Sequence, residues 1–484
     1  MNILLDKIGS ITSLYNDKHW SNQKISLEVK SRLNKLSTLG VTREDRVIIL
    51  HGSTPAFFAD LFAVWGLGAC AVCLNPNLSS PEVRRIIDFI DPRLLLLNEN
   101  QESFSNLPSE LLFDLNKYRK KSKSKPDNPN ASKLDDNALI LFTSGTTSTP
   151  KGVVHTFRSL LSRISLNSSY ISLEDLNVTL CPLPTHFGHG LIGNCLTPLL
   201  SGKELILVPG GEIETITNFG SLIDKYNVTF LSSVPTLWKL AVKLAKPPTG
   251  GTLKRVHIGS APLSGELWSE VIEWSGVNQV LNMYGITETA NWIAGASAKD
   301  YRLESGLIGK MWGGTAAVKN ESDILCSVGE GEIMLQSPSV MSGYYNLPEL
   351  TANSLQNGWF ATGDTGSIDN NGLLRLMGRI KFEINKAGMK INPEDIDILL
   401  ESNTHVNEAC AFGLSDPIVG ETVAVAISPR DSAVFDLDSL KTWCSDNLVH
   451  EKVPEKWFIL EEIPKTDRGK INRNLVAEVC LKKK

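Results

Sequence analysis

The sequence has no excess of positive charge. It contains 48 lysines and arginines against 53 aspartates and glutamates, and its formal net charge is −5. Proteins that bind nucleic acid carry a basic patch or stripe that neutralises phosphates, and no such stripe is present here. The single lysine-rich run, at positions 117–125, continues into a polar stretch and indicates a solvated loop. A nucleic-acid partner is therefore not expected.

The sequence also lacks a targeting segment and a long hydrophobic run. Its first twenty residues have no basic region followed by a sustained apolar one, so they do not form a signal peptide. The longest uncharged apolar stretch, 61–74, is too short to cross a bilayer core of about 30 Å. Gly66 and Gly68 interrupt it, which predicts a buried helix followed by a buried strand. We expect no membrane span and a cytoplasmic location.

Cysteine is sparse, with eight residues scattered along the chain. Cys70 and Cys73 have the spacing of a CxxC pair, but they lie in an apolar run and no second pair follows at the spacing of a zinc site. They are predicted to be buried thiols. Scattered cysteines agree with a reducing cytosol.

A chain of 484 residues is too long for one ordinary core. Short β-rich runs alternate with helical patterns, which predicts parallel α/β layers. The strands are expected at 46–51, 69–74, 205–208, 228–232 and 255–258, and the helices at 54–65, 215–226 and 235–244. From Gly306 to Arg379 the chain is rich in glycine and short strands, which predicts an antiparallel β-rich subdomain.

After Arg379 a compact tail again alternates strands and helices, with helices expected at 393–401 and 437–447. We therefore predict a large N-terminal domain of layered α/β sheets with a β-rich subdomain, over residues 1–379, and a small C-terminal α+β domain over residues 380–484.

The clearest local signal is Leu141–Thr156, LFTSGTTSTPKGVVHT. An apolar run leads into a loop of hydroxyls and glycine, which Lys151 closes with a positive charge. Backbone N–H groups and these hydroxyls can surround phosphate oxygens. The spacing is not that of the Walker loop. By composition alone, a plain Ser/Thr/Gly surface loop is the favoured interpretation.

Five further segments follow in order: VHIGSAPL at 256–263, LNMYGITE at 281–288, WFATGDTG at 359–366, GRIKFEINKAGMKINP at 378–393 and IPKTDRGKI at 463–471. Together with TSGTTSTPKG they resemble the signatures of the adenylate-forming superfamily, which includes acyl-CoA and aryl-CoA synthetases, nonribosomal adenylation domains and firefly luciferases. The resemblance spans positions 141–471, and the conserved order leaves little room for coincidence.

The resemblance implies a nucleotide site for ATP and Mg²⁺. Tyr284 would pack on adenine, Asn282 would bond its amine, and Asp364 would accept hydrogen bonds from ribose. Glu288 would bind Mg²⁺ together with Thr146, because Mg²⁺ prefers hard oxygen ligands. The full implied set is Thr143, Ser144, Gly145, Thr146, Thr147, Lys151, Gly259, Ser260, Ala261, Asn282, Tyr284, Gly285, Thr287, Asp364 and Arg379.

The implied catalytic residues are Lys470, Glu288, Thr146 and Lys151. Lys470 would bridge the substrate carboxylate and the α-phosphate. It belongs to the small domain, which in the family rotates about a hinge, here at Lys381, between the two half-reactions. Asn385 departs from the family's frequent lysine at that position.

The resemblance places the acyl pocket at His186, Phe187, His189, Val234 and Ser260. The segment matches the family's PLFHxxGL motif loosely, and the expected histidine position falls on Phe187. Amino-acid-activating members usually carry an aspartate near here, and none occurs between Cys181 and Cys195. An acyl or aryl acid is therefore favoured over an α-amino acid. Trp292, Trp312 and Met311 either close the pocket or belong to the core.

The expected reaction is ATP-dependent conversion of a carboxylic acid to acyl-AMP and pyrophosphate, followed by transfer to the thiol of CoA. One alternative is a stand-alone ligase that loads an acyl or aminoacyl group onto the phosphopantetheine of an acyl carrier protein. A second is a non-catalytic nucleotide-binding module, and a light-emitting oxygenase is formally possible.

Overall fold

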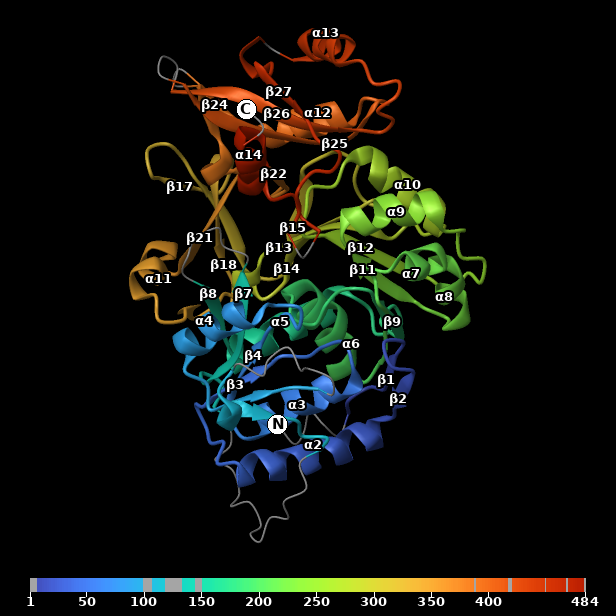
Figure 1. The fold of residues 1–484 in the computed structure, drawn as a ribbon, viewed down its shortest axis with the longest axis vertical. Coiled ribbons are helices and arrows are strands. Elements are labelled where there is room, and N and C mark those ends of the chain that lie inside the picture. Colours follow the sequence, from blue (N-terminus) through green and yellow to red (C-terminus); the bar gives the residue numbers. More distant parts are fainter. Residues whose placement is uncertain are drawn as a thin grey trace. The chain divides into compact units, whose positions relative to one another are not determined.

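The structure is a computed structural model that describes residues 7–98, 107–117, 133–143, 150–386, 389–416, 420–448, 450–466 and 469–482. The chain forms two compact units (Figure 1). The large unit comprises Met1–Thr315 and Gln336–Phe360, and the small unit comprises Ala316–Leu335 and Ala361–Lys484. The domain boundary at 379/380 and the hinge at Lys381 stay predictions.

One sheet of the large unit has seven strands in the order β19-β8-β7-β4-β3-β5-β6. The five strands from β7 to β6 are parallel neighbours, whereas β8 pairs antiparallel with both β7 and β19. The strands are β3 (Arg46–Ile49), β4 (Cys70–Cys73), β5 (Leu94–Leu96), β6 (Leu112–Phe113), β7 (Asn137–Thr143), β8 (Lys151–Thr156) and β19 (Gly343–Tyr344).

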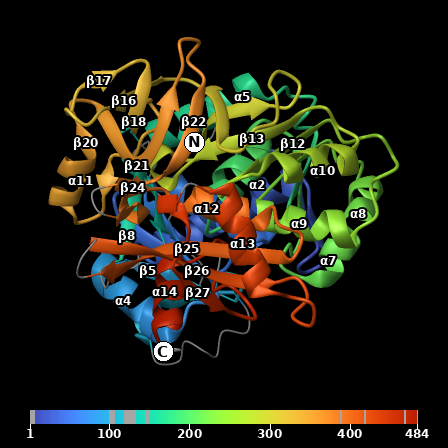
Figure 2. The ribbon, with the colours of Figure 1, turned by 90° about the horizontal axis from the view of Figure 1, so that it is seen from above.

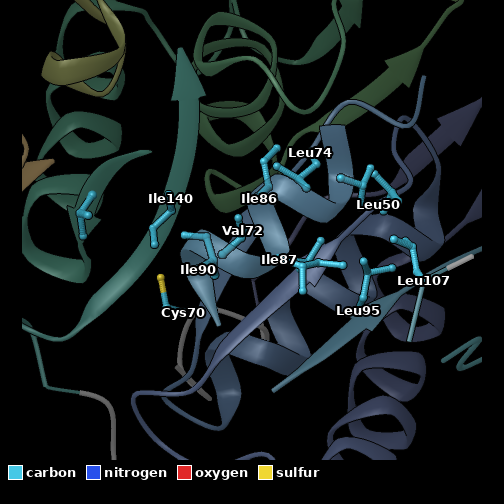
Figure 3. Close-up of a cluster of buried hydrophobic side chains, with 13 residues drawn as sticks. Leu50, Cys70, Val72, Leu74, Ile86, Ile87, Ile90, Leu95, Leu107 and Ile140 are labelled. Atoms are coloured by element: carbon cyan, nitrogen blue, oxygen red, sulfur yellow. The ribbon is translucent and has the colours of Figure 1, made fainter. Parts of the chain in front are cut away.

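Helix α4 (Ser80–Ile90) covers this sheet. Its N-terminus is closed by a capping box, in which Ser79 and Glu82 satisfy each other's backbone N–H groups. Its apolar residues recur every three or four positions, so they lie on one face. Figure 3 shows Ile86, Ile87 and Ile90 among the apolar side chains of the strands, with Ile90 beside Val72 and Ile140. This packing places β7 and β8, which flank the predicted phosphate loop, on a rigid support.

A second group of strands in the large unit follows the order β15-β14-β13-β12-β11-β9-β10-β1-β2. The strands from β13 to β1 are parallel neighbours, and β14 and β15 are antiparallel. They are β1 (Ile11–Ser13), β2 (Lys18–Trp20), β9 (Val178–Cys181), β10 (Glu204–Leu207), β11 (Phe230–Ser233), β12 (Arg255–Gly259), β13 (Val280–Gly285), β14 (Trp292–Ser297) and β15 (Leu307–Met311).

The helices of the large unit connect these strands. They are α2 (Asn22–Thr38), α3 (Pro55–Gly66), α5 (Phe157–Tyr170), a π-helix η3 (His189–Leu196), α6 (Thr197–Leu200), α7 (Ile213–Thr217), α8 (Phe219–Lys225), α9 (Pro235–Leu244), α10 (Gly265–Ser275) and α11 (Pro348–Ser354). The prediction of a single helix at 215–226 is wrong in one respect. The structure has two helices there, α7 and α8, which are separated at Asn218. The side chain of Asn218 bonds the carbonyl of Glu214, a local contact that competes with helix continuation.

The small unit contains an antiparallel pair of long strands, β25 (Val406–Asp416) and β26 (Gly420–Pro429). Alternate residues of β25 face opposite sides, so Ala409 and Ala411 pack with α12 (Pro393–Glu401) and α13 (Leu437–Asn447). Cys410 and Phe412 pack with α14 (Arg473–Lys482). Figure 2 shows these helices along the strands. The sheet is therefore covered on both faces.

The rest of the small unit holds short strands, and its pairs β16–β17 and β21–β22 are antiparallel. The antiparallel subdomain predicted after Gly306 is therefore confirmed for these pairs. The strands are β16 (Thr315–Lys319), β17 (Leu325–Cys326), β18 (Gly329–Gln336), β21 (Trp359–Ile368), β22 (Leu374–Arg379), β23 (Ile384–Lys386), β24 (Met389–Ile391) and β27 (Lys456–Ile459), and β20 (Leu355–Gln356) pairs with β21.

Several sequence predictions are confirmed. The α/β class holds, and the stretch 61–74 is a buried helix end followed by buried strand β4. Cys70 and Cys73 are buried free thiols, and burial raises the pKa of Cys70 to about 12. Within the described ranges, no helix combines the length and the apolar character that a bilayer crossing needs.

A buried ion pair joins α2 to α3. The Nε atom of Arg32 lies 2.7 Å from Oδ1 of Asp60, and both side chains are under 5% exposed. His51 contacts the other carboxylate oxygen of Asp60 at 2.9 Å. The same guanidinium reaches Asn116 at 2.8 Å. The carboxylates of Asp60 and Glu28 therefore both compensate the Arg32 cation, and Glu28 precedes Arg32 by one turn of α2.

We predict that Asp60→Ala lowers the free energy of unfolding by about 1–3 kcal/mol, because the buried Arg32 guanidinium loses an acceptor while Glu28 still offsets its charge. Urea titration of the purified variants measures the change. The control is Asp88→Ala, which breaks the exposed i,i+4 pair with Arg84 and should cost at most about 0.5 kcal/mol. Equal losses in the two variants would contradict the prediction.

Candidate functional site

The predicted phosphate loop is a connection between β7 and β8. Residues 138–141 of β7 are buried, and Thr143 is paired with Lys151 across the two strands. Lys151 therefore begins the strand that leaves the loop. Ser144, Gly145, Thr146 and Thr147 lie outside the described residues, as does the side chain of Thr143. Their phosphate and Mg²⁺ roles stay predictions.

The ends of β12 and β13 bring the predicted adenine-binding residues together. These strands are parallel, with Ile258 opposite Asn282 and Gly259 opposite Met283. A Cβ on Gly259 would lie 2.8 Å from the Met283 carbonyl oxygen, so only glycine fits this close approach. Ser260 then turns the chain with φ of 72°, followed by Ala261. Open α/β sheets bind ligands at such carboxyl ends of strands.

One end of the Asn282 side-chain amide is already hydrogen-bonded within the protein. Its Nδ2 donates to the Leu307 carbonyl at 2.8 Å, and its side chain is buried. The amide oxygen is therefore the atom with which Asn282 would accept the predicted hydrogen bond from an adenine amine. Tyr284, at the end of the same strand, is 5% exposed. Gly285 has no room for a side chain, since a Cβ there would lie 2.2 Å from the Asn291 carbonyl oxygen.

Glu288 lies in a single 3-10 turn, η4 (Thr287–Thr289), directly after β13. Its carboxylate oxygen Oε1 accepts a hydrogen bond from the Tyr344 hydroxyl at 2.9 Å. Its backbone carbonyl accepts from the Met341 N–H at 2.8 Å. The neighbouring carbonyl of Thr287 lies 2.8 Å from Nε2 of His155 on β8. The turn is therefore tied to the strand that begins at Lys151.

His155 is a neutral donor in this contact. It is fully buried, and burial lowers the pKa of its imidazole to about 4, although the Thr287 carbonyl acts in the opposite direction. A neutral imidazole has one N–H, and Nε2 must carry it to bond a carbonyl oxygen.

A buried histidine organises the predicted acyl pocket. His189, at the start of η3, contacts the Ser260 hydroxyl through Nδ1 at 2.9 Å and the Ser232 hydroxyl through Nε2 at 2.6 Å. Its ring lies 5.4 Å from that of Trp292 and 5.9 Å from that of Phe187. Three predicted pocket residues thus meet: Phe187, His189 and Ser260. Val234 is buried after β11, and His186 is half-buried.

The turn that follows His189 lies against buried polar atoms. A Cβ on Gly193 would lie 2.0 Å from Asn291 Nδ2 and 2.9 Å from a ring carbon of Trp292. Within the described part of the chain, Asn291 Nδ2, Trp292 Nε1 and Asn194 Oδ1 are buried without a hydrogen-bond partner. A buried polar group of this kind destabilises the folded protein unless a partner supplies the missing hydrogen bond. Trp292 is therefore a core residue that contacts His189 of the predicted pocket.

The small unit holds the other nucleotide residues. Asp364 on β21 lies opposite Arg379 on β22, and Nε of Arg379 is 2.6 Å from Oδ1 of Asp364. Asp364 is 4% exposed. Nearby, burial raises the pKa of Glu394 to about 7, whereas Arg473 and Arg379 act in the opposite direction. The structure therefore brings together the two residues that the sequence predicted at ribose.

Lys470 is exposed and lies in a closed turn of the small unit. The Thr466 N–H donates to its carbonyl at 2.7 Å, and its own N–H donates to the Thr466 hydroxyl at 3.3 Å. Gly469 enables this turn with φ of 72°. Lys381 lies in the 3-10 turn η5 (Ile380–Phe382), with its ammonium 4.6 Å from the centre of the Phe382 ring. Asp467, Arg468 and Gly388 lie outside the described residues.

Sequence reasoning missed four residues of this site: His155, Ser232, Asn291 and Tyr344. Ser232 and Tyr344 are 43 and 56 positions from the residues they bond, so no local pattern could pair them. Asn291 directly precedes Trp292, whose pocket role was left open, and that adjacency was the available signal. His155 lies inside the quoted phosphate-loop segment but contacts a different strand end.

Comparisons with known proteins agree with this arrangement. Residues 10–345 match the family model described as AMP-binding enzyme, and residues 395–470 match the one described as AMP-binding enzyme C-terminal domain. An oxalate–CoA ligase of Arabidopsis thaliana is 32% identical over 98% of this chain and 95% of that protein. An oxalate–CoA ligase of Saccharomyces cerevisiae is 30% identical over 73% of this chain and 65% of that protein.

The fold is also found among solved structures. The o-succinylbenzoate CoA synthetase of Bacillus subtilis, in complex with its acyl-adenylate intermediate, superposes with a TM-score of 0.86 at 24% identity. The match covers 97% of this chain and 94% of that one. At this identity the likeness establishes the shared fold.

The buried His155 predicts a specific loss of stability in acid. Its folded pKa of about 4 lies below the ordinary value, so the unfolded chain binds the proton first as the pH falls. The stability is complete above about pH 6.5 and declines toward pH 4, by about 2 kcal/mol at about pH 5. Replacement of His155 by glutamine removes this term. The thermal midpoint of the His155→Gln variant should therefore fall less than that of the unmodified protein between about pH 7 and about pH 5.

The control is His450→Gln, which changes an exposed histidine of the small unit. The contribution of the other buried histidines is the same in both proteins and cancels in the comparison. A His155→Gln variant with the same pH slope as the unmodified protein would show that His155 is not the titrating group.

Proposed function

The chain belongs to the AMP-binding enzyme family, and from that premise we propose how this adenylating acid–thiol ligase works. ATP and Mg²⁺ bind at the ends of β12 and β13, and the acid attacks the α-phosphate to give acyl-AMP and pyrophosphate. The acyl group then passes to the thiol of CoA. The observation that supports this proposal best is the group of polar side chains formed by His189, Ser232 and Ser260, which suits an acid held beside the strand ends.

Catalysis in this proposal is mostly electrostatic. A carboxylate is a poor nucleophile toward an anionic phosphate, so positioned cations must neutralise both partners. Lys151, the hydroxyls of 143–147 and Mg²⁺ on Glu288 would hold the outer phosphates. Lys470 would neutralise the carboxylate and the α-phosphate together. Asp364 and Arg379 would hold the ribose.

The residues fit a Mg²⁺ ion that is shared with ATP. In the described residues, no group of three or more histidine, cysteine or acidic side chains forms a cage for a metal. Glu288 supplies one half-buried carboxylate. Mg²⁺ typically takes one or two carboxylates and completes its shell with phosphate oxygens and water. Glu288 would help to hold the metal, which would offset the negative charge of the phosphates.

We further propose that the acid is small and carries a second polar group. Asn291 Nδ2 and Trp292 Nε1 are buried donors without a partner in the described structure, and a carboxylate oxygen is a matching acceptor. An apolar chain in the same place would leave both donors unsatisfied. The likeness to two oxalate–CoA ligases supports a short dicarboxylic acid.

The phosphopantetheine of a carrier protein is the second candidate acceptor of the acyl group. We keep this candidate because Asn385 occupies a position at which the family frequently has a lysine. A comparison of CoA with a pantetheinylated carrier on one preparation decides between them. The cytoplasm remains our proposed location, and seven of the eight free thiols are buried.

Lys470→Ala should reduce ATP–pyrophosphate exchange by about 10²–10³-fold, because it removes a charge aligned with the transition state. ATP binding should be nearly unchanged, since the adenine residues belong to the other unit. Because the side chain is exposed in a turn closed by backbone contacts, the variant should fold normally. The control is Lys482→Ala at the exposed end of α14. Exchange near the unmodified rate would remove Lys470 from the reaction.

The acid preference is tested by pyrophosphate exchange with oxalate, malonate, succinate, hexanoate, benzoate and glycine. We expect the short dicarboxylates to be fastest. Gly193→Ala should reduce their kcat/KM at least tenfold and leave ATP binding intact, because the added methyl would displace Asn291 and Trp292. The control is Gly211→Ala, where an added Cβ meets nothing within 4 Å. Faster exchange with hexanoate than with oxalate would refute the polar-pocket proposal.

A further inference from the structure

Glu288 is held from a segment that precedes α11. This segment, Met341–Tyr345, contains β19, and we name it the strap. The Met341 N–H donates to the Glu288 carbonyl, and the Tyr344 hydroxyl donates to Oε1 of its side chain. The strap therefore holds both the backbone and the carboxylate of the predicted Mg²⁺ ligand.

The strap is itself fixed to β8. Gly343 pairs with Val154 and Tyr344 with Val153. The N–H groups of Ser342 and Tyr345 donate to the carbonyls of Val154 and Gly152, at 2.9 and 2.8 Å. Since β8 begins at Lys151, the strap connects the predicted phosphate-binding lysine to the predicted metal carboxylate over a few residues.

The Tyr344 side chain has little freedom. Its backbone N–H donates to the Thr351 hydroxyl at 2.9 Å. Its ring packs against a small apolar cluster whose buried members are Val153, Met341 and Phe360. Because the ring is packed, its hydroxyl is presented to Glu288 from a fixed place. A rigid donor of this kind selects one rotamer of a carboxylate.

We propose that Tyr344 is a positioning residue for the metal ligand: its hydroxyl fixes Oε1 of Glu288 and thereby leaves Oε2 directed at Mg²⁺. A hydrogen bond from a phenol to an ionised carboxylate is charge-assisted. Without it, the carboxylate samples other rotamers and pays an ordering cost when the metal binds. The inference rests on the proposed role of Glu288 in binding Mg²⁺.

Tyr344→Phe tests this inference, because it removes the hydroxyl and keeps the packed ring. The Mg²⁺ concentration that gives half-maximal pyrophosphate exchange should rise about tenfold at saturating ATP. Calorimetric titration of Mg²⁺ into the protein with a non-hydrolysable ATP analogue should show the same shift without turnover.

Tyr345→Phe is the matched control. Tyr345 is the next residue of the strap, and its hydroxyl donates to the Ile90 carbonyl at 3.2 Å instead. It should leave both Mg²⁺ titrations unchanged. Thermal unfolding of both variants detects any general loosening of the strap, which would affect ATP binding as well as the Mg²⁺ response.

Glu288→Gln separates the two levels of the proposal. If Glu288→Gln shifts the Mg²⁺ titration and Tyr344→Phe does not, the positioning role is wrong and the metal role of Glu288 stands. If Glu288→Gln has no effect, the metal role itself fails. If both shift it, the double variant should be no worse than Glu288→Gln alone, because the hydroxyl acts through that carboxylate. An additive loss would overturn the inference.

Discussion

The buried hydrogen bond between His155 and the Thr287 carbonyl joins the two sheets of the large unit at the place where chemistry is expected. β8 belongs to the seven-stranded sheet, whereas Thr287 follows β13 of the other sheet. Burial keeps the imidazole neutral, so the contact is a plain donor–acceptor bond that needs no counter-ion. Through it, Lys151 and Glu288 become parts of one rigid frame although they are 137 positions apart in the chain.

Polar groups near the acyl pocket divide into two classes. Those that carry the architecture are satisfied, as His189 is by Ser232 and Ser260. Those that face the turn at Gly193 are not, as Asn291 and Trp292 show. A folded protein satisfies most of its buried polar groups, and in our proposal the second polar group of the acid supplies the acceptor that these two donors lack.

The sequence was sufficient for several elements that depend on local pattern. Periodicity located α3, α9, α12 and α13 within a residue or so, and motif order located the strand ends around Tyr284 and Glu288. The prediction failed where a single residue interrupts a helix, as at Asn218. The periodicity would continue that helix, but the Asn218 side chain bonds the Glu214 carbonyl there. It also could not supply Tyr344 or Ser232, because their partners are distant in sequence and only the folded sheets bring them together.

The predicted reacting groups are divided between two compact units. Tyr284, Glu288 and His189 belong to one, and Asp364, Arg379 and Lys470 belong to the other. Each set is held by contacts within its own unit, as the Tyr344–Glu288 and Arg379–Asp364 pairs illustrate. Neither set therefore depends on the other unit for its own local geometry. In a reaction with two steps, this is the property that one shared acyl pocket requires, because the acyl-AMP must stay bound while the groups that made it give way to the thiol.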